Sequence, residues 1–443
     1  MRVIFPFPSE MEAAGYESLA YCPFLLSFDG SYPDAPNRYL RERSLCEWLP
    51  KLRAAWDEDS DIGGIEFQTK ESCAGMAKRL LEFLLWCDAK AYDWRTIQYA
   101  TLIKEWQTGM LSGTCSRSGR KLVATTVNGR IHEATLFLVW AWERGLRERF
   151  IVPLKPIASR PRSNGRQPAT NTEHQSKKRV GLVPTSPSKL LLPSPKEVGT
   201  WLHQVRLLKG TVKGMCCELI PSTGIRISEC IQWRVDTLPE RERWEIVDGH
   251  VPCTIRFGVK GGKISPGSLE GTKPREILVP VDLAERMDHY RKWQRPTQIR
   301  RWISAAKTKQ ERDRRTRERQ PSQLWLGETS NRPFSNSQLY QDWKGVPACP
   351  ASWHPHAGRE FFAVELIVAH TRRMMETNSQ TTVPPMNWLI GAMAGQVRII
   401  LMPLLGHVSE DTTHLYLRAA RARLVMEIGH PAMRWQEYVD AED

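Results

Sequence analysis

The sequence predicts a mainly helical chain of two domains, with one small β-hairpin in the second domain. The chain has 443 residues, which is more than one ordinary domain holds. Hydrophobic residues make up 41% and charged residues 25%, so most of the chain can bury a core. Apolar residues recur mainly at spacings of three and four, which indicates amphipathic helices, and only three short segments resemble strands.

The first part of the chain is expected to be helical. Residues 1–64 are interpreted as an N-terminal extension and residues 65–152 as a small helical domain. Two helices of this domain are expected at Thr96–Gly109 and from Thr125 or Thr126 to Gly145, because threonine caps helices and glycine ends them. The helix before them is predicted from one apolar stripe, Met76, Leu80, Phe83, Leu84 and Cys87.

Residues 153–193 differ in composition from the segments on either side. They combine many prolines with Ser, Asn, Lys and Arg, which predicts an extended basic linker. The second domain is expected to cover residues 194–443. It begins with helices, and its strand-like segments are Trp244–Val247, Thr254–Val259 and Glu276–Val281.

Charge narrows the possible partners. Lysine and arginine total 63 against 49 acidic residues, a net charge of +14, which favours a polyanion, nucleic acid first. It argues against an enzyme for small neutral substrates. No apolar run approaches the length of a membrane span, so no membrane partner is expected. The ten cysteines include no Cys-x-x-Cys pair, which argues against zinc and favours a cytoplasmic chain with reduced thiols.

Four short segments of the second domain carry chemistry together. They are Ser222-Thr-Gly-Ile-Arg226-Ile-Ser-Glu229, then Val259-Lys260-Gly-Gly-Lys263 with Lys273-Pro-Arg-Glu-Ile-Leu-Val-Pro280, then His354-Pro-His356-Ala-Gly-Arg359, and Leu404-Leu-Gly-His407 with Tyr416 after eight further residues. In this order and spacing they resemble the tyrosine recombinase (phage integrase) family, and the likeness covers this domain nearly end to end. The helical segment 69–150 also looks like the family's core-binding domain.

The residue types suit phosphodiester cleavage. Negative charge grows on the phosphate oxygens in the transition state, and guanidinium forks such as Arg226 and Arg359 bind such oxygens bidentately. A tyrosine hydroxyl, here Tyr416, is a poor nucleophile unless a base or a positive field activates it. His356 is a candidate to accept that proton, and His407 can donate to a phosphate oxygen. The protein's own cations replace a metal, so no metal or other cofactor is expected.

The general acid for the departing 5′ oxygen is a choice between two lysines. Lys260 is preferred, because Gly-Gly-Lys follows it, as often happens after the family's hairpin lysine. Lys273 is the alternative, because the loop between the two is longer than is common in the family. The other lysine, together with Lys263 and Arg275, is expected to contact DNA. Glu229 resembles the acidic residue that orients the family's first arginine.

Some features depart from the family or allow a plainer interpretation. Glu360 stands where the family usually has a second histidine. Two insertions, residues 295–320 and 371–395, lengthen the domain, and the first is either a solvated helix or an added contact to the DNA backbone. Taken alone, Arg226 could be a surface residue paired with Glu229. Tyr416 could be a core tyrosine, and Tyr340 and Tyr438 are other tyrosines, although neither follows a Gly-His pair.

The resemblance implies a site-specific recombinase or integrase that acts on double-stranded DNA. Two domains would form a clamp around the duplex, and Tyr416 would form a 3′-phosphotyrosyl bond without ATP or metal. It further implies four protomers on two DNA sites, a cytoplasmic, nucleoid-associated protein and service to a mobile genetic element. The alternatives are a type IB topoisomerase-like enzyme, a catalytically inactive DNA-binding protein, and a metal-dependent nuclease, for which the sequence holds no carboxylate cluster.

Overall fold

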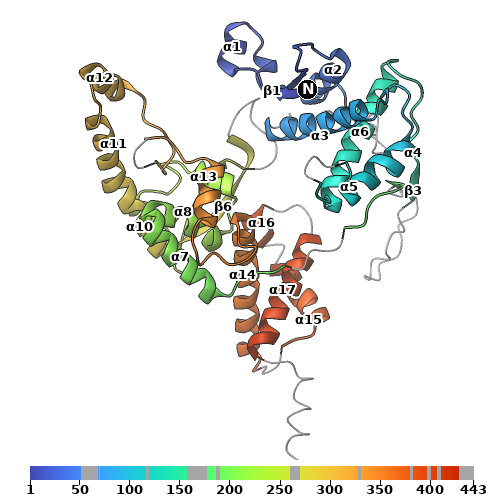
Figure 1. Ribbon diagram of the computed structural model, residues 1–443. Coiled ribbons are helices and arrows are strands. Elements are labelled where there is room, and N and C mark those ends of the chain that lie inside the picture. The colour runs from blue at the N-terminus through green and yellow to red at the C-terminus, as the bar shows by residue number, and fades with distance from the viewer. Residues whose placement is uncertain are drawn as a thin grey trace, which may run out of the picture. The chain divides into compact units, whose positions relative to one another are not determined.

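In the computed structural model the chain forms two compact units. Figure 1 colours the chain by residue number. Unit 1 covers Met1–Pro187, and unit 2 covers Ser188–Gly261 and Leu269–Asp443. The structure describes residues 1–50, 68, 70–115, 119–156, 177–185, 190–259, 270–327, 331–379, 383–396, 401–406 and 411–428. It does not describe the side chains of residues 270–273, 392–396, 402, 411–414 and 428 within these ranges.

Unit 1 is built around two long helices. α3 (Lys70–Ala89) packs against α6 (Ala124–Glu143), and α3 buries the apolar stripe that the sequence predicts. Their shared core is rich in aromatic rings, which bury large apolar areas per residue. The N-cap of α6 is Val123, so the cap predicted at Thr125 or Thr126 is wrong. The other elements are β1 (Arg2–Ile4), α1 (Pro8–Ala13), η1 (Glu17–Leu19), β2 (Phe24–Leu26), α2 (Asp34–Ser44), α4 (Tyr99–Thr101), η2 (Leu102–Gln107), α5 (Thr108–Ser112), β3 (Leu154–Pro156) and β4 (Lys177–Arg179).

The N-terminal residues belong to the same core, rather than forming a separate extension. β1 pairs antiparallel with β2, and Leu25 and Leu40 are wholly buried with α3 and α6. The Tyr39 hydroxyl donates to Glu133 Oε1 at 2.7 Å. The Trp140 indole donates to Glu42 Oε2 at 2.8 Å. These buried polar pairs span about a hundred residues of chain, so local periodicity does not reveal them.

The described part of the predicted linker is held against unit 1 by hydrogen bonds. β3 and β4 pair antiparallel, and the Tyr99 hydroxyl donates to the carbonyl oxygen of Val180 at 2.6 Å. The Asn128 amide donates to the carbonyl oxygen of Val183 at 2.8 Å. Residues 157–176 and 186–189 lie outside the described residues, so the linker boundary remains a prediction.

The first helix of unit 2, α7, begins with Ser194 as its N-cap. Ser194 and Glu197 form a reciprocal capping box. The elements are α7 (Pro195–Lys209), α8 (Thr211–Thr223), α9 (Ile227–Ile231), η3 (Arg241–Arg243), β5 (His250–Phe257), β6 (Glu270–Pro280), α10 (Val281–His289), η4 (Tyr290–Gln294), α11 (Arg295–Ser304), α12 (Lys309–Arg317), α13 (Asn336–Lys344), α14 (Pro355–Thr377), α15 (Met386–Gln396), α16 (Met402–Leu405) and α17 (Asp411–Ile428).

The predicted hairpin is confirmed, but one predicted strand is wrong. β5 and β6 pair antiparallel from His250 opposite Pro280 to Ile255 opposite Arg275. Trp244–Val247 is not a strand, because the chain turns back at once: only Val247 bridges to His250. Asp248 and Gly249, which lie between them, both have positive φ, at 47° and 74°, as a tight reversal requires.

Two apolar cores stabilise unit 2. One surrounds α7, α8, the hairpin and α13, with Trp201, Trp343 and Trp353 in mutual contact. The other lies between α14 and α17. The predicted fold class, mainly helical with a small β-hairpin, is therefore confirmed. Among the described residues, no helix is both long enough and apolar enough to cross a membrane.

Candidate active site

Arg226 stands at the start of α9, on a turn that requires glycine. α8 ends at Thr223, and Gly224 has φ +69°; a Cβ there would lie 2.4 Å from the ring of Phe362. Two residues later Arg226 is the N-cap of α9. Its backbone N–H donates to Glu229 Oε2 at 2.7 Å, and its guanidinium donates to Glu229 Oε1 at 3.0 Å. The Thr-Gly-x-Arg sequence therefore fixes the direction of this arginine.

Glu229 binds a second arginine as well. It is fully buried, and Arg275 on β6 donates to its Oε2 at 2.5 Å. The Arg275 side chain is 8% exposed, and its Nε and one terminal nitrogen have no hydrogen-bond partner among the described residues. Burial lowers the pKa of Arg275, and the carboxylate of Glu229 opposes that shift. One carboxylate thus serves two guanidinium groups.

Arg359 is the most deeply buried of the arginines. It lies on the first turns of α14 with 1% exposure, and it donates to the carbonyl oxygens of Gly224, at 2.5 Å, and of Leu405. Burial, with the nearby charges of Arg226 and Arg275, lowers its pKa to about 9. Burial is the larger cause, and the two neighbouring guanidinium groups add to it because like charges that are held close together favour loss of a proton.

Tyr416 lies on α17, in the same electrostatic environment. It is 1% exposed and packs with Ala363, Leu405 and Leu417 in the core between α14 and α17. Its pKa is raised to about 12, because burial and then the carboxylate of Glu360 raise it more than the charges of Arg359 and Arg226 lower it. The structure therefore brings Arg226, Arg359 and Tyr416, which are far apart in sequence, into one site.

His356 and Glu360 form a pair one turn apart on α14. His356 Nε2 lies 3.6 Å from Glu360 Oε1, with 66% of the histidine side chain and 18% of the glutamate side chain exposed. Burial raises the pKa of Glu360 to about 7, and the charge of Arg359 opposes that shift. His354 caps the helix by accepting from the Ala357 N–H at 3.1 Å. The pair joins the solvent side of the site to the region of Tyr416.

The 404–406 turn contacts two of the arginines from the other side. Arg226 donates to the carbonyl oxygen of Gly406 at 3.4 Å. Gly406 has φ +58°, and a Cβ on it would lie 3.1 Å from Arg275 Cδ. The Leu-Gly part of the fourth segment is thus placed against the arginines, as a shared site requires.

Several site residues predicted from the sequence lie outside what the structure describes. They are Lys260, Lys263 and His407; Lys273 is on β6, but its side chain is not described. Arg275, expected to contact DNA, is buried on Glu229. Glu360 has no role predicted from the sequence, although its four-residue spacing from His356 is typical of a side-chain pair on a helix. Among the described residues, no group of His, Cys, Asp or Glu side chains could hold a metal ion.

Comparisons with known proteins find likeness in structure alone. No protein-family model and no curated protein matches the chain. The chain is similar to XerH site-specific recombinase bound to palindromic difH substrate, with 15% identity, 82% of this chain and 80% of that chain covered, and a TM-score of 0.46. It is also similar to the Tn1549 transposon integrase in complex with circular intermediate DNA, with 12% identity, 79% and 91% covered, and a TM-score of 0.40.

A third similar structure is a lambda integrase dimer bound to a core site, with 11% identity, 79% and 89% covered, and a TM-score of 0.40. These three proteins are tyrosine recombinases. At such identities and TM-scores, what this chain does is argued from its own residues.

Proposed function

We propose that the chain is a site-specific DNA recombinase or integrase that cuts and rejoins double-stranded DNA through a 3′-phosphotyrosyl bond. The observation that carries the proposal is the convergence of Arg226, Arg359 and Tyr416. The charges of both arginines oppose the rise of the tyrosine pKa that burial causes, so its hydroxyl lies within their field. A phosphate bound by those arginines would sit close to a nucleophile.

The arginines that would bind the phosphate, here called the phosphate clamp, are inferred from charge and geometry. Arg226, Arg275 and Arg359 bring three guanidinium groups together, and in the described part of the site Glu229 is the carboxylate that binds two of them, Arg226 and Arg275. The excess positive charge complements a phosphodiester, and complements it better as charge grows on the oxygens in the transition state. Arg226 is the partly exposed member, with 22% of its side chain open to solvent. It is therefore the group that meets the phosphate first, while Arg359 supports it from the interior.

The bond changes balance without a redox partner. The Tyr416 oxygen bonds to phosphorus, its proton passes to the His356–Glu360 pair, and the bond from phosphorus to the 5′ oxygen breaks. The departing oxygen takes a proton from Lys260 or, as the alternative, from Lys273. His407 donates to a non-bridging oxygen. The ester keeps the bond energy, so the 5′ hydroxyl of another strand reverses the step and no ATP is consumed.

The wider arrangement is also a proposal. Four protomers act on two DNA sites, with unit 1 serving as the core-binding half of a clamp and unit 2 as the catalytic half. Such a protein works in the cytoplasm, at the nucleoid, for a mobile genetic element. The net charge of +14 supports the DNA partner.

Covalent capture tests the proposal directly. The chain is incubated with a pool of labelled, randomised duplexes, each nicked so that a cut fragment is released and religation fails. A labelled adduct that survives denaturation and is lost on protease digestion is expected. Tyr416→Phe should form no adduct while still binding DNA. Tyr340→Phe is the matched control, since that tyrosine is 47% exposed on α13, and it should react as the parent does. An adduct with Tyr416→Phe would refute the nucleophile.

A further inference from the structure

The strongest unassigned feature is a basic segment of unit 2. Residues 300–319, here called the basic arm, cover the second half of α11, all of α12 and the residues that flank α12. They hold nine basic and three acidic residues, a net charge of +6 in a chain of net charge +14. Eight of the basic side chains are exposed: Arg300, Arg301, Lys307, Lys309, Arg312, Arg314, Arg317 and Arg319.

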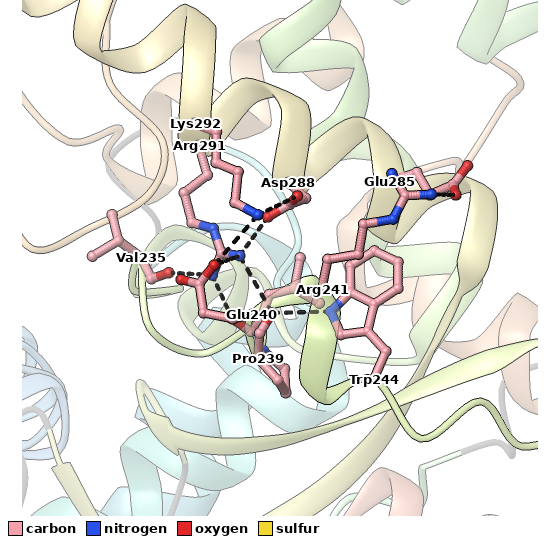
Figure 2. A network of polar contacts seen from close by, with 10 residues as sticks. Val235, Pro239, Glu240, Arg241, Trp244, Glu285, Asp288, Arg291 and Lys292 are labelled. Carbon is pink, nitrogen blue, oxygen red and sulfur yellow. Dashed lines mark hydrogen bonds and ion pairs between the residues drawn. The ribbon is translucent and has the colours of Figure 1, made fainter.

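The arm stands on a rigid base. Figure 2 shows η4 and α10 joined to the loop before η3, with Arg291 at the centre. Its guanidinium donates to the carbonyl oxygens of Leu238, at 2.6 Å, and Val235, at 3.1 Å, and pairs with Asp288. Lys292 adds ion pairs to Asp288 and Glu240. The helix that carries the arm is therefore fixed in direction before α11 begins.

A second anchor lies at the first residue of α11. Arg295 is 9% exposed and donates to the carbonyl oxygens of Pro321, Gln323 and Leu324, at 2.5, 3.1 and 3.2 Å. Gln298 donates to the carbonyl oxygen of Gly327 at 2.8 Å. Within unit 2, Figure 1 shows α10, α11 and α12 leading away from α8, with α12 at the far end.

On one face of α12, Arg315 forms the ion pair that the structure describes within the arm. Arg315 pairs with Glu311 at 2.6 Å, donates to the carbonyl oxygen of Trp302, and lies over the Trp302 ring at 4.7 Å. Glu311 also caps the turn at Lys307 by accepting its N–H at 3.0 Å. Among the described residues, none of the eight exposed basic side chains forms an ion pair.

This arrangement costs stability and fits a polyanion. Like charges three or four residues apart, such as Lys309 with Arg312 and Arg314 with Arg317, destabilise a helix. α12 contains no apolar residue, so it has nothing to insert into a lipid layer and no anchor for a protein groove. Its nine residues span about 14 Å at about 1.5 Å each, a length over which duplex DNA carries about eight phosphate charges.

We propose that the basic arm is a second DNA-binding surface, which grips the phosphate backbone of the duplex outside the phosphate that is cut. This inference rests on the proposed function for its choice of partner. The arm supplies affinity without reading sequence, because charge contacts to phosphates carry no base information. It lies in an insertion and contributes nothing to the bond-making step.

Salt dependence of binding tests the arm. A neutral-arm variant carries Lys309→Gln, Arg312→Gln, Arg314→Gln, Arg317→Gln and Arg319→Gln, in the full chain with Tyr416→Phe so that binding stays reversible. Affinity for a labelled mixed-sequence duplex is measured by fluorescence anisotropy over a range of KCl. Each lost phosphate contact lowers the log–log slope by about 0.9, so three contacts would lower it by about 2.7.

Two matched variants separate charge from shape. Replacing the same four arginines of the neutral-arm variant by lysine keeps the charge and should keep the slope. Asp313→Asn with Glu318→Gln removes two negative charges from the same arm, which raises its net charge by two, and should steepen the slope or leave it as steep as in the parent. Circular dichroism should be unchanged in every variant, since each altered side chain is exposed.

Each outcome bears on one proposal. An unchanged slope in the neutral-arm variant overturns the arm proposal and makes α12 a solvated helix. Equal losses on duplex RNA or on vesicles of phosphatidylserine and phosphatidylcholine, with none on DNA, assign the surface to another partner and overturn it too. Adduct formation by the Tyr416-containing chain is scored separately. Failure of the adduct with a normal slope refutes the recombinase and leaves the arm standing.

Discussion

The arginines of the active site and those of the basic arm are the same residue type in opposite surroundings. Arg226, Arg275 and Arg359 are held by a buried carboxylate and by carbonyl oxygens, and each has one defined direction. The arm's exposed arginines have solvent around them and no acidic partner among the described residues. Buried cations act individually and are little screened, whereas exposed ones act together and weaken with salt. This contrast orders the expected effects of substitutions.

The largest effect is expected for the general acid, a hairpin lysine. Like each active-site arginine, it should act as a single residue whose loss the other cations do not replace. Proton transfer by a positioned side chain contributes about 10²- to 10⁴-fold. Lys260→Ala should lose cleavage on this scale with ordinary DNA and regain most of it with a 5′-bridging phosphorothiolate, whose thiolate leaves without a proton. Lys273→Ala should be slowed equally on both substrates.

The opposite pattern would transfer the role of general acid to Lys273. Rescue of neither variant would mean that another group is the acid, and His356 is the next candidate. The measurement is the rate of adduct formation on the two substrates.

The next effect concerns the clamp. Lysine keeps the charge but lacks the planar fork, so Arg226→Lys and Arg359→Lys should each lose about 10²- to 10³-fold in cleavage, the scale of one preorganised donor. Arg314→Lys on the arm is the matched control and should cleave as the parent does. Single-turnover cleavage rates at fixed salt decide the matter. Parental activity in either clamp variant would refute the clamp.

Stability separates the two regions next. Glu229→Gln leaves the partly exposed guanidinium of Arg226 and the buried one of Arg275 without their carboxylate, and it should lower the free energy of unfolding by about 3 kcal/mol or more, as when a buried ion pair is broken. Glu311→Gln removes a partly exposed pair on the arm and should cost less than about 1 kcal/mol. Urea unfolding of both variants gives the comparison. Equal losses would mean that the contrast between the regions is wrong.

The pH dependence of Glu360 gives a fourth test, at the edge between buried and exposed. Its pKa is raised in the folded state from 4.5 to about 7, so the folded chain binds more protons than the unfolded chain over that range. Stability should therefore fall as pH rises from 4.5 to 7 and stay lower above it. Glu360→Gln should remove this penalty, which is at most about 3 kcal/mol. At pH 8 the variant should therefore unfold at a higher urea concentration than the parent.

The same variant should lose cleavage. In the parent, cleavage should increase with pH through about 7, as the Glu360 carboxylate ionises and supports His356. In Glu360→Gln the rate should be lower and this step should flatten. A variant that is destabilised at pH 8, or that keeps the step near pH 7, would contradict the assignment.

The smallest effect is expected for one arm residue. Arg314→Gln alone should lower the salt slope of DNA binding by about 0.9 and leave cleavage at low salt unchanged. Arg315→Gln is the internal comparison, because that guanidinium is spent on Glu311 and Trp302. Arg315→Gln should lower the helicity of the arm and change the salt slope of DNA binding less than Arg314→Gln does. A large cleavage defect in Arg314→Gln would mean that the arm takes part in the chemistry.

Local patterns in the sequence were sufficient for the elements that they describe. The stripe through Met76 and Phe83 and the β5–β6 hairpin follow from spacing. The four segments also predicted a shared site for Arg226, Arg359 and Tyr416. The roles of these residues stay predictions, as do those of Lys260, Lys273 and His407.

Other features depend on contacts that spacing does not encode. Tyr39 meets Glu133 across 94 residues, which no periodicity announces. Arg275 is different, because the sequence does contain a signal. It lies two and four residues before Ile277 and Val279, which are fully buried, and residues at this spacing share one face of a strand, so Arg275 belongs to the inner face of β6. Its positive charge predicts a DNA contact, but its position in the strand predicts burial, and the structure agrees with the second prediction.

The base of the basic arm has a consequence for how such a chain can change. Arg295, shortly before the arm, donates to the carbonyl oxygens of Leu324 and Pro321, shortly after it, so the two segments that flank the arm lie side by side. Deleting a segment whose ends already meet costs little loop-closure entropy and leaves the core behind it intact. The arm is therefore a cassette: it can be cut out, shortened or exchanged for another charged module, and the catalytic fold would close over the gap with a short turn.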